Sequence, residues 1–187
     1  MGKLGIVIII IIVVAVGGIF VLGSGGDNTL PTEVAQGRAE NTEGTEQFNK
    51  VPQFAFEDNK GNEVTPNDFP GKILVVNSWA TWCPFCVDEL PDFVELQKNF
   101  ADDIVVIAID RAESRSTAVG YTDGLGVTDD LVWLLDPSDS FYRSIGGFSM
   151  PETLFVDSEG NIRIHKRGPM DIKEMTEKVT SILEQSD

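Results

Sequence analysis

Histidine and cysteine are almost missing from this chain, which has one histidine and two cysteines in 187 residues. A structural zinc site takes four Cys or His ligands, and the chain offers only Cys83, Cys86 and His165. We therefore expect no metal site. No cysteine stands directly after the apolar N-terminal run, which excludes lipid attachment there. Internal repeats and a phosphate-binding glycine loop are also missing, so neither a repeat array nor a nucleotide-binding domain is predicted.

Basic residues are also scarce: 14 Lys and Arg stand against 30 Asp and Glu, a net charge of −16. No basic cluster is long enough to follow a phosphate backbone, so nucleic acid is excluded as a partner. The acidity is better explained by solubility or a salt-adapted surface than by recruitment of a basic substrate.

The two cysteines lie three positions apart, in Trp82-Cys83-Pro84-Phe85-Cys86. Thiols at C-x-x-C spacing can close into one small disulfide ring, which stores and releases two electrons. A purely structural disulfide is the alternative, but so short a loop removes little chain entropy. The pattern favours a redox-active Cys83–Cys86 pair without any further cofactor.

The residues on either side of the motif predict where it lies. The apolar, β-branched run at 73–78 is typical of a buried strand, and 87–100 has the apolar spacing of a helix. The cysteines then lie at a helix N-terminus, where unpaired N–H groups and the helix dipole favour a thiolate. Cys83 is the predicted nucleophile and Cys86 the resolving thiol.

Leu4 to Leu22 is a run of 19 residues without a charge. As a helix it would be about 28 Å long, close to the hydrocarbon thickness of a bilayer. Lys3 precedes it and the next charge is Asp27, which predicts a cytoplasmic N-terminus and an extracytoplasmic remainder. A cleaved signal peptide is the alternative, although the run is long for one and Val21-Leu22-Gly23 is a poor cleavage site.

Composition divides the chain into residues 1–23, a membrane anchor; 24–50, a polar flexible linker; and 51–187, one domain. Within the domain, alternating apolar runs and amphipathic segments predict an α/β fold with crossover connections. The expected elements are a hairpin around 53–62, strands at 73–78, 104–109, 132–135, 153–156 and 162–165, and helices at 87–100, 116–125, 140–145 and 172–183.

Several stretches resemble the thioredoxin superfamily, and in particular its membrane-tethered TlpA/ResA-like branch. They are Phe69-Pro70-Gly71-Lys72, Asn77-Ser78-Trp79-Ala80-Thr81-Trp82-Cys83, Glu89-Leu90-Pro91 and Ser149 to Asp157 followed by Glu159-Gly160. The resemblance covers about residues 51 to 187. It implies a thioredoxin-like fold, a central mixed sheet flanked by helices, and thiol–disulfide oxidoreductase activity.

The resemblance also implies roles for single residues. Met150-Pro151 would be a cis peptide packed against the disulfide, where an extended substrate can pair with the backbone. Glu89, three residues after Cys86, would accept the Cys86 proton. The alternative for Glu89 is a first-turn acid that only complements the helix dipole. Asn77 stands where cytoplasmic thioredoxins usually carry a buried aspartate, which makes Glu89 the better proton-transfer candidate.

Substrate contact is expected at Trp82, Pro84 and Phe85 around the thiols, together with Met150 and Pro151; Trp79 is expected in the core. Pro84 and Phe85 differ from the residues usual in this branch and offer the thiolate no side-chain donor. With Glu89 and Glu152 as nearby acids, this predicts a weakly stabilised thiolate and therefore a reductant.

The predicted function is reduction of extracytoplasmic protein disulfides, such as those of apocytochromes awaiting haem, with electrons from a membrane partner. The same site could instead work as a dithiol oxidase. A copper-handling chaperone is disfavoured for two reasons. Copper-binding relatives carry a C-x-x-x-C motif, and His165 of this chain is followed by Lys166 and Arg167, whose positive charges disfavour a cation. A peroxiredoxin-type peroxidase would need Thr or Ser three residues before a cysteine, and Ala80 stands there before Cys83. A non-catalytic adaptor would fail to reduce insulin.

Overall fold

A computed structural model describes residues 50–185 of the chain, and the predicted anchor and most of the predicted linker lie outside this range. The elements run, in chain order, β1 (Phe56–Asp58), β2 (Glu63–Val64), a 3₁₀ turn η1 (Pro66–Asp68), β3 (Ile73–Trp79), α1 (Pro84–Asn99), β4 (Ile104–Arg111), α2 (Arg115–Leu125), β5 (Val132–Asp136), α3 (Ser140–Ser144), β6 (Glu152–Val156), β7 (Ile162–Arg167) and α4 (Ile172–Leu183). No helix in this range is long and apolar enough to cross a membrane.

The strands form one mixed sheet in the order β2-β1-β5-β4-β3-β6-β7. The three central strands β5, β4 and β3 run parallel, and β6 and β1 pair antiparallel on either side of them. Two register pairs matter for the site: Asn77 of β3 lies opposite Thr153 of β6, and Trp79 lies opposite Asp110 of β4. Each pair brings polar side chains to the end of the sheet where β3 stops.

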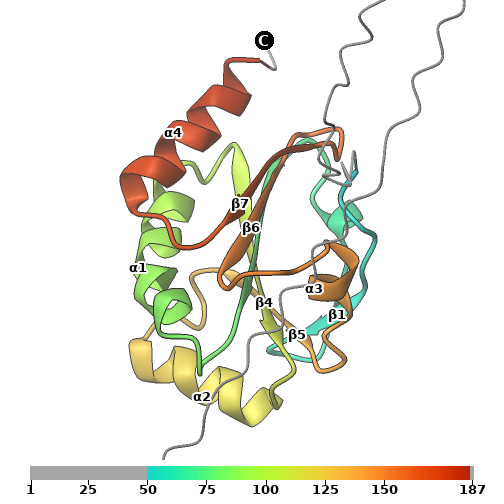
Figure 1. The fold of residues 1–187 in the computed structure, drawn as a ribbon, viewed down its shortest axis with the longest axis vertical. Coiled ribbons are helices and arrows are strands. Elements are labelled where there is room, and N and C mark those ends of the chain that lie inside the picture. Colours follow the sequence, from blue (N-terminus) through green and yellow to red (C-terminus); the bar gives the residue numbers. More distant parts are fainter. Residues whose placement is uncertain (1–49, 186–187) are drawn as a thin grey trace, which may run out of the picture. The chain divides into compact units, whose positions relative to one another are not determined.

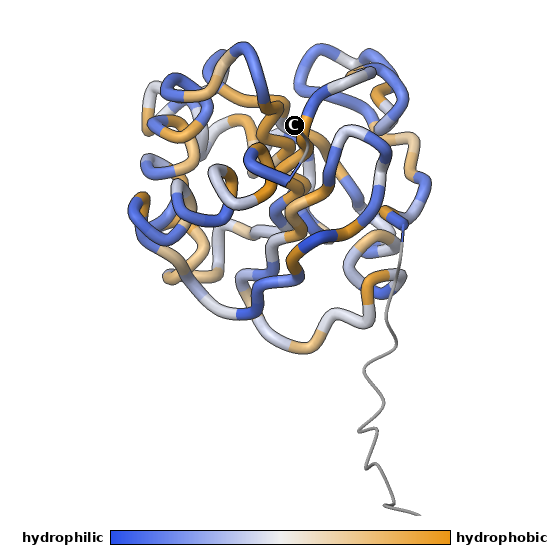
Figure 2. Tube along the Cα trace, turned by 90° about the horizontal axis from the view of Figure 1, so that it is seen from above, coloured by the Kyte–Doolittle hydropathy of each residue, from blue (hydrophilic) through white to orange (hydrophobic). Residues whose placement is uncertain are grey.

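Helices cover both faces of the sheet (Figure 1). Successive side chains of a strand point to opposite faces, and β3 follows this rule. Ile73 and Val75 pack with α1 and α4, whereas Leu74 and Val76 pack with α3. The most hydrophobic stretches of the chain run through the middle of the trace in Figure 2. The buried strands are thus apolar on both faces, as in other sheets covered on two sides.

The predicted elements are all present, with shifted ends. The N-terminal hairpin is formed by β1 and β2 and lies a few residues later than expected. Helix α1 starts earlier than predicted, at Pro84 rather than Val87, because Cys83 itself caps it and proline suits the first helical position. The predicted α/β fold with a central mixed sheet is confirmed.

Candidate active site

Strand β3 leads directly into the cysteine motif. It ends at Trp79, and Cys83 is the N-cap of α1, with its sulfur accepting a hydrogen bond from the backbone N–H of Cys86 at 3.2 Å. Cys83 and Cys86 form a disulfide with their Cα atoms 5.3 Å apart. The predicted position of the motif, between a buried strand and a helix N-terminus, is therefore confirmed.

The two sulfurs differ in access. Cys83 is 5% exposed and Cys86 is completely buried. A substrate can therefore approach Cys83 and not Cys86, in the order that the sequence predicts for nucleophile and resolving thiol. Both side chains pack against Trp79, Leu90 and Trp133, so the disulfide closes over an apolar cluster.

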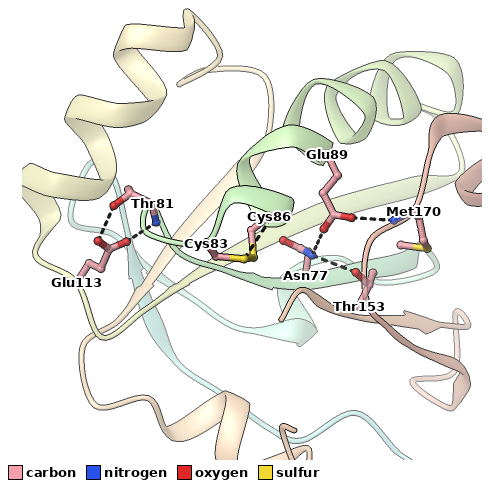
Figure 3. Close-up of a disulfide and its surroundings, with 8 residues drawn as sticks. All are labelled: Asn77, Thr81, Cys83, Cys86, Glu89, Glu113, Thr153 and Met170. Carbon is pink, nitrogen blue, oxygen red and sulfur yellow. Dashed lines mark hydrogen bonds between the residues drawn. A yellow bond between two sulfur atoms is a disulfide. The ribbon is translucent and has the colours of Figure 1, made fainter. Parts of the chain in front are cut away.

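A buried polar group lies beside this cluster, on the side of β6 and α4 (Figure 3). The Asn77 side-chain amide donates to Glu89 Oε1 and to Thr153 Oγ1, both at 3.0 Å. Glu89 Oε2 accepts a third bond, from the backbone N–H of Met170 at 3.1 Å. Asn77, Glu89 and Thr153 are each at most 2% exposed. The carboxyl group is thus held by two donors in a site that excludes water.

Burial raises the pKa of Glu89 to about 8, outweighing the hydrogen bonds from Met170 and Asn77, which lower it. The alternative role for Glu89 as a first-turn partner of the helix dipole is wrong, because α1 begins at Pro84 and has no acid in its first turn. Its pKa is close to that of an ordinary thiol, about 8.5, as two-way proton exchange requires. Within residues 50–185 Glu89 has no hydrogen bond to either sulfur, so its proton-transfer role stays a prediction.

Asn77 suits both protonation states of Glu89. As drawn, its amide N–H₂ donates to the carboxyl, and its Oδ1 is buried without a hydrogen-bond partner in the part of the chain described. A half-turn of the amide would present this oxygen to a protonated Glu89, and the Thr153 hydroxyl can donate or accept in either orientation. An aspartate at position 77 would instead put two buried carboxyl groups side by side.

A second carboxyl group lies on the other side of the disulfide. Glu113 accepts hydrogen bonds from the backbone N–H and the hydroxyl of Thr81, both at 2.6 Å, and so fixes the segment just before Cys83 (Figure 3). Nearby Asp110 is 1% exposed, and its carboxyl group lies next to the side chain and the backbone N–H of Glu113. Burial, together with the Glu113 carboxyl, raises the pKa of Asp110 to about 8.

The predicted substrate-contact residues divide into two groups. Trp82 and Phe85 are 60% and 62% exposed, and Pro84 is exposed too, so these three form the open rim beside Cys83. Met150 is half-buried and packs against the disulfide cluster, while Pro151 is buried. The Met150-Pro151 peptide is cis, as predicted. Trp79 is 1% exposed, in the core as expected.

Glu152 holds the loop that carries this proline. Its Oε1 accepts from the backbone N–H groups of Phe148 and Ser149, at 2.6 and 2.7 Å, and its Oε2 lies 2.7 Å from His165 Nε2. Burial alone would raise the pKa of Glu152, but the hydrogen bonds from His165 and the two N–H groups outweigh it and lower the pKa. The only histidine of the chain therefore supports a loop.

Sequence reasoning missed three parts of this site: Phe148, which is 85% exposed, and the carboxyl groups of Asp110 and Glu113. Phe148 could have been found from the sequence, because it is a large apolar residue within a polar loop. Asp110 follows the uniformly apolar run 104–109, and only its pairing with Trp79 in the sheet shows that it lies beside the site. No group of three or more Cys, His, Asp and Glu side chains in residues 50–185 could hold a metal ion.

Comparison with known proteins agrees with the geometry. The thioredoxin-like protein YneN of Bacillus subtilis is 29% identical over 140 residues, covering 73% of this chain and 80% of YneN. The thiol-disulfide oxidoreductase ResA of the same organism is 26% identical over 135 residues, covering 72% of each chain. A crystal structure described as a putative thiol:disulfide interchange protein DsbE from Chlorobium tepidum superimposes with a TM-score of 0.67 at 22% identity, covering 73% of this chain and 97% of that one.

These likenesses confirm the resemblance to ResA-like proteins and the thioredoxin-like fold. The Redoxin family model matches residues 46–183, a range that includes every strand and helix described above. A match of this extent makes the chain a member of the Redoxin family.

Proposed function

We propose that this thiol–disulfide oxidoreductase reduces disulfides of proteins outside the cytoplasm, apocytochromes awaiting haem among them. The observation that carries the proposal is the Cys83–Cys86 disulfide at the start of α1, in which Cys83 is 5% exposed and Cys86 is completely buried. The Cys83 thiolate attacks a substrate disulfide and forms a mixed disulfide. Cys86 then attacks Cys83, releases the substrate as a dithiol and leaves the enzyme oxidised.

The direction of electron flow depends on how strongly the Cys83 thiolate is stabilised. Pro84 occupies the first helical position and has no N–H to donate, and among residues 50–185 the Cys83 sulfur accepts a hydrogen bond from the Cys86 N–H alone. Neither Pro84 nor Phe85 has a side-chain donor. A thiolate with so few donors is poorly stabilised, which makes the dithiol a better reductant.

The charges of Glu89 and Glu152 do not oppose the thiolate as the sequence predicts. Glu89 does not oppose the thiolate by its charge at neutral pH, because its pKa of about 8 keeps it protonated. Glu152 is ionised, but its charge faces His165 and Arg167. The lack of side-chain donors at positions 84 and 85 is therefore what favours reduction.

A redox titration of the domain against dithiothreitol tests the direction. We expect a midpoint potential at or below about −250 mV, as in thioredoxin-like reductants. A midpoint near about −120 mV, typical of strong oxidants, would overturn the proposal in favour of a dithiol oxidase. Insulin reduction in the same preparation distinguishes either enzyme from an adaptor without activity.

The extracytoplasmic location is also part of the proposal and is supported by the uncharged run Leu4–Leu22 after Lys3. It implies a single anchor in the membrane and an electron donor that is itself a membrane protein. Protease added to spheroplasts should remove the domain from Val51 onward and leave cytoplasmic proteins intact. A soluble mature protein beginning near Gly23 or Ser24 would show that the run is a cleaved signal.

A further inference from the structure

Arg111, at the end of β4, lies under the rim of the active site. Its guanidinium carbon is 3.5 Å from the ring centroid of Tyr142 and 5.9 Å from that of Trp82, within cation–π range of both rings. Two parallel hydrogen bonds to Asp139, at 2.8 and 2.7 Å, fix the orientation of the guanidinium. Its side chain is 16% exposed. Arg111 is therefore a fixed cation shared by two aromatic rings.

Tyr142, on α3, continues the stack to the loop before the cis proline. A Cβ atom at Gly147 would lie 2.4 Å from the Tyr142 ring, so glycine is needed for the loop to approach this closely. The next residue is Phe148, the most exposed large apolar side chain of the described chain. A continuous row of contacts therefore runs from Trp82 through Arg111 and Tyr142 to Gly147. It connects the cysteine motif with the loop before the cis proline.

The backbone of the turn after Arg111 is also constrained. Ala112 has a φ of +62°, rare for a residue with a Cβ, and its N–H donates to Asp136 O at 3.0 Å. Glu113 then binds Thr81, the neighbour of Trp82. Residues on both sides of Ala112 thus contact the segment before Cys83: Arg111 faces Trp82, and Glu113 binds Thr81.

We propose that Arg111 is a positioning residue that fixes Trp82 against the Tyr142–Gly147 stack and thereby sets the affinity for protein disulfides. The inference rests on the proposed function, because a rim of this kind matters only to a polypeptide substrate that must lay a segment beside Cys83. Trp82 exposes 60% of its surface. A Trp82 side chain that is already fixed in the free protein loses less conformational entropy when a substrate binds. Binding is therefore tighter, while the chemistry at sulfur is unchanged.

The test compares Arg111→Met with Arg143→Met. Arg143 also faces Asp139, at 3.9 Å, but is 64% exposed and is not within cation–π range of either ring. We expect Arg111→Met to raise KM for insulin reduction, driven by dithiothreitol, about five- to tenfold with kcat within about twofold. Reduction of bis(2-hydroxyethyl) disulfide, too small to contact the rim, should keep its rate. Arg143→Met should match the parent with both substrates.

Acrylamide quenching of tryptophan fluorescence in the reduced protein gives a readout that does not depend on activity. Trp79 and Trp133 are 1% and 4% exposed, so quenching reports mainly Trp82, with Trp82→Phe as the blank. We expect the quenching constant of Arg111→Met to be larger than that of the parent protein. The quenching constant of Arg143→Met should equal that of the parent. Arg111→Lys should resemble Arg111→Met, because lysine keeps the charge but cannot make the paired bonds to Asp139.

An insulin KM for Arg111→Met equal to that of Arg143→Met would overturn the proposal, and so would unchanged quenching. Should Arg111→Met fail to fold, Asp139→Asn loosens the same guanidinium and is expected to shift KM and quenching in the same direction by a smaller amount. Lack of insulin reduction by the parent chain would instead contradict the proposed function, and the quenching comparison would still decide whether Arg111 holds Trp82.

Discussion

Replacing Cys86 by serine is expected to stop turnover and to trap substrates on the enzyme. Cys83 keeps its exposed edge and its place at the helix N-terminus, so it still attacks a disulfide. Nothing remains to attack the resulting mixed disulfide, and multiple-turnover insulin reduction should fall by about a thousandfold or more. Non-reducing gels of cells expressing Cys86→Ser should show higher-mass adducts that dithiothreitol removes.

Cys83→Ser is the matched control, because it should lose turnover equally without forming adducts. Cys86 is fully buried and cannot reach a protein disulfide from where it lies. Alkylation of the reduced protein near neutral pH should accordingly modify Cys83 first. Faster labelling of Cys86, or adducts on Cys83→Ser instead, would contradict the assignment of the two roles.

Much of this site could be predicted because its chemistry is local in the sequence. The C-x-x-C spacing, the apolar strand before it and the amphipathic helix after it all lie between Ile73 and Asn99. Local patterns fix such an arrangement, since the strand, the turn and the helix follow each other directly. The cis proline was predicted for another reason, namely a motif that resembles a known branch.

The missed parts depend on contacts between distant segments. Asp110 is beside Trp79 only because β4 pairs with β3, and Arg111 reaches Tyr142 only because α3 covers the same face as the end of β4. The environment of Glu89 comes from Asn77, twelve residues earlier, and Met170, 81 residues later. Sequence placed Glu89 near the thiols but gave no sign that burial would raise its pKa.

The two buried carboxyl groups make the stability of the fold depend on pH. The pKa of Glu89 rises from 4.5 to about 8, and that of Asp110 from 3.8 to about 8. Between these values the folded protein binds a proton that the unfolded chain has released, so the free energy of unfolding decreases as pH rises. The penalty is absent below about pH 4 and complete above about pH 8.

Asp110→Asn and Glu89→Gln should therefore raise the free energy of unfolding at pH 9. For each variant, the change at pH 9 should be more favourable than the change at pH 4 by up to about a few kcal/mol. Urea unfolding at the two pH values measures it. Asp88→Asn, an exposed site on α1, is the control and should show no such difference.

The same two variants separate a proton-transfer carboxyl from a merely buried one. Glu89 lies one turn after Cys86 on α1, so Glu89→Gln should slow resolution of the mixed disulfide and remove a step near pH 8 from its pH–rate profile. Asp110→Asn should keep that step while gaining the same alkaline stability. If Glu89→Gln gains stability and its pH–rate profile does not change, Glu89 is a structural group held by Asn77 and Met170, and the Cys86 proton leaves by another route.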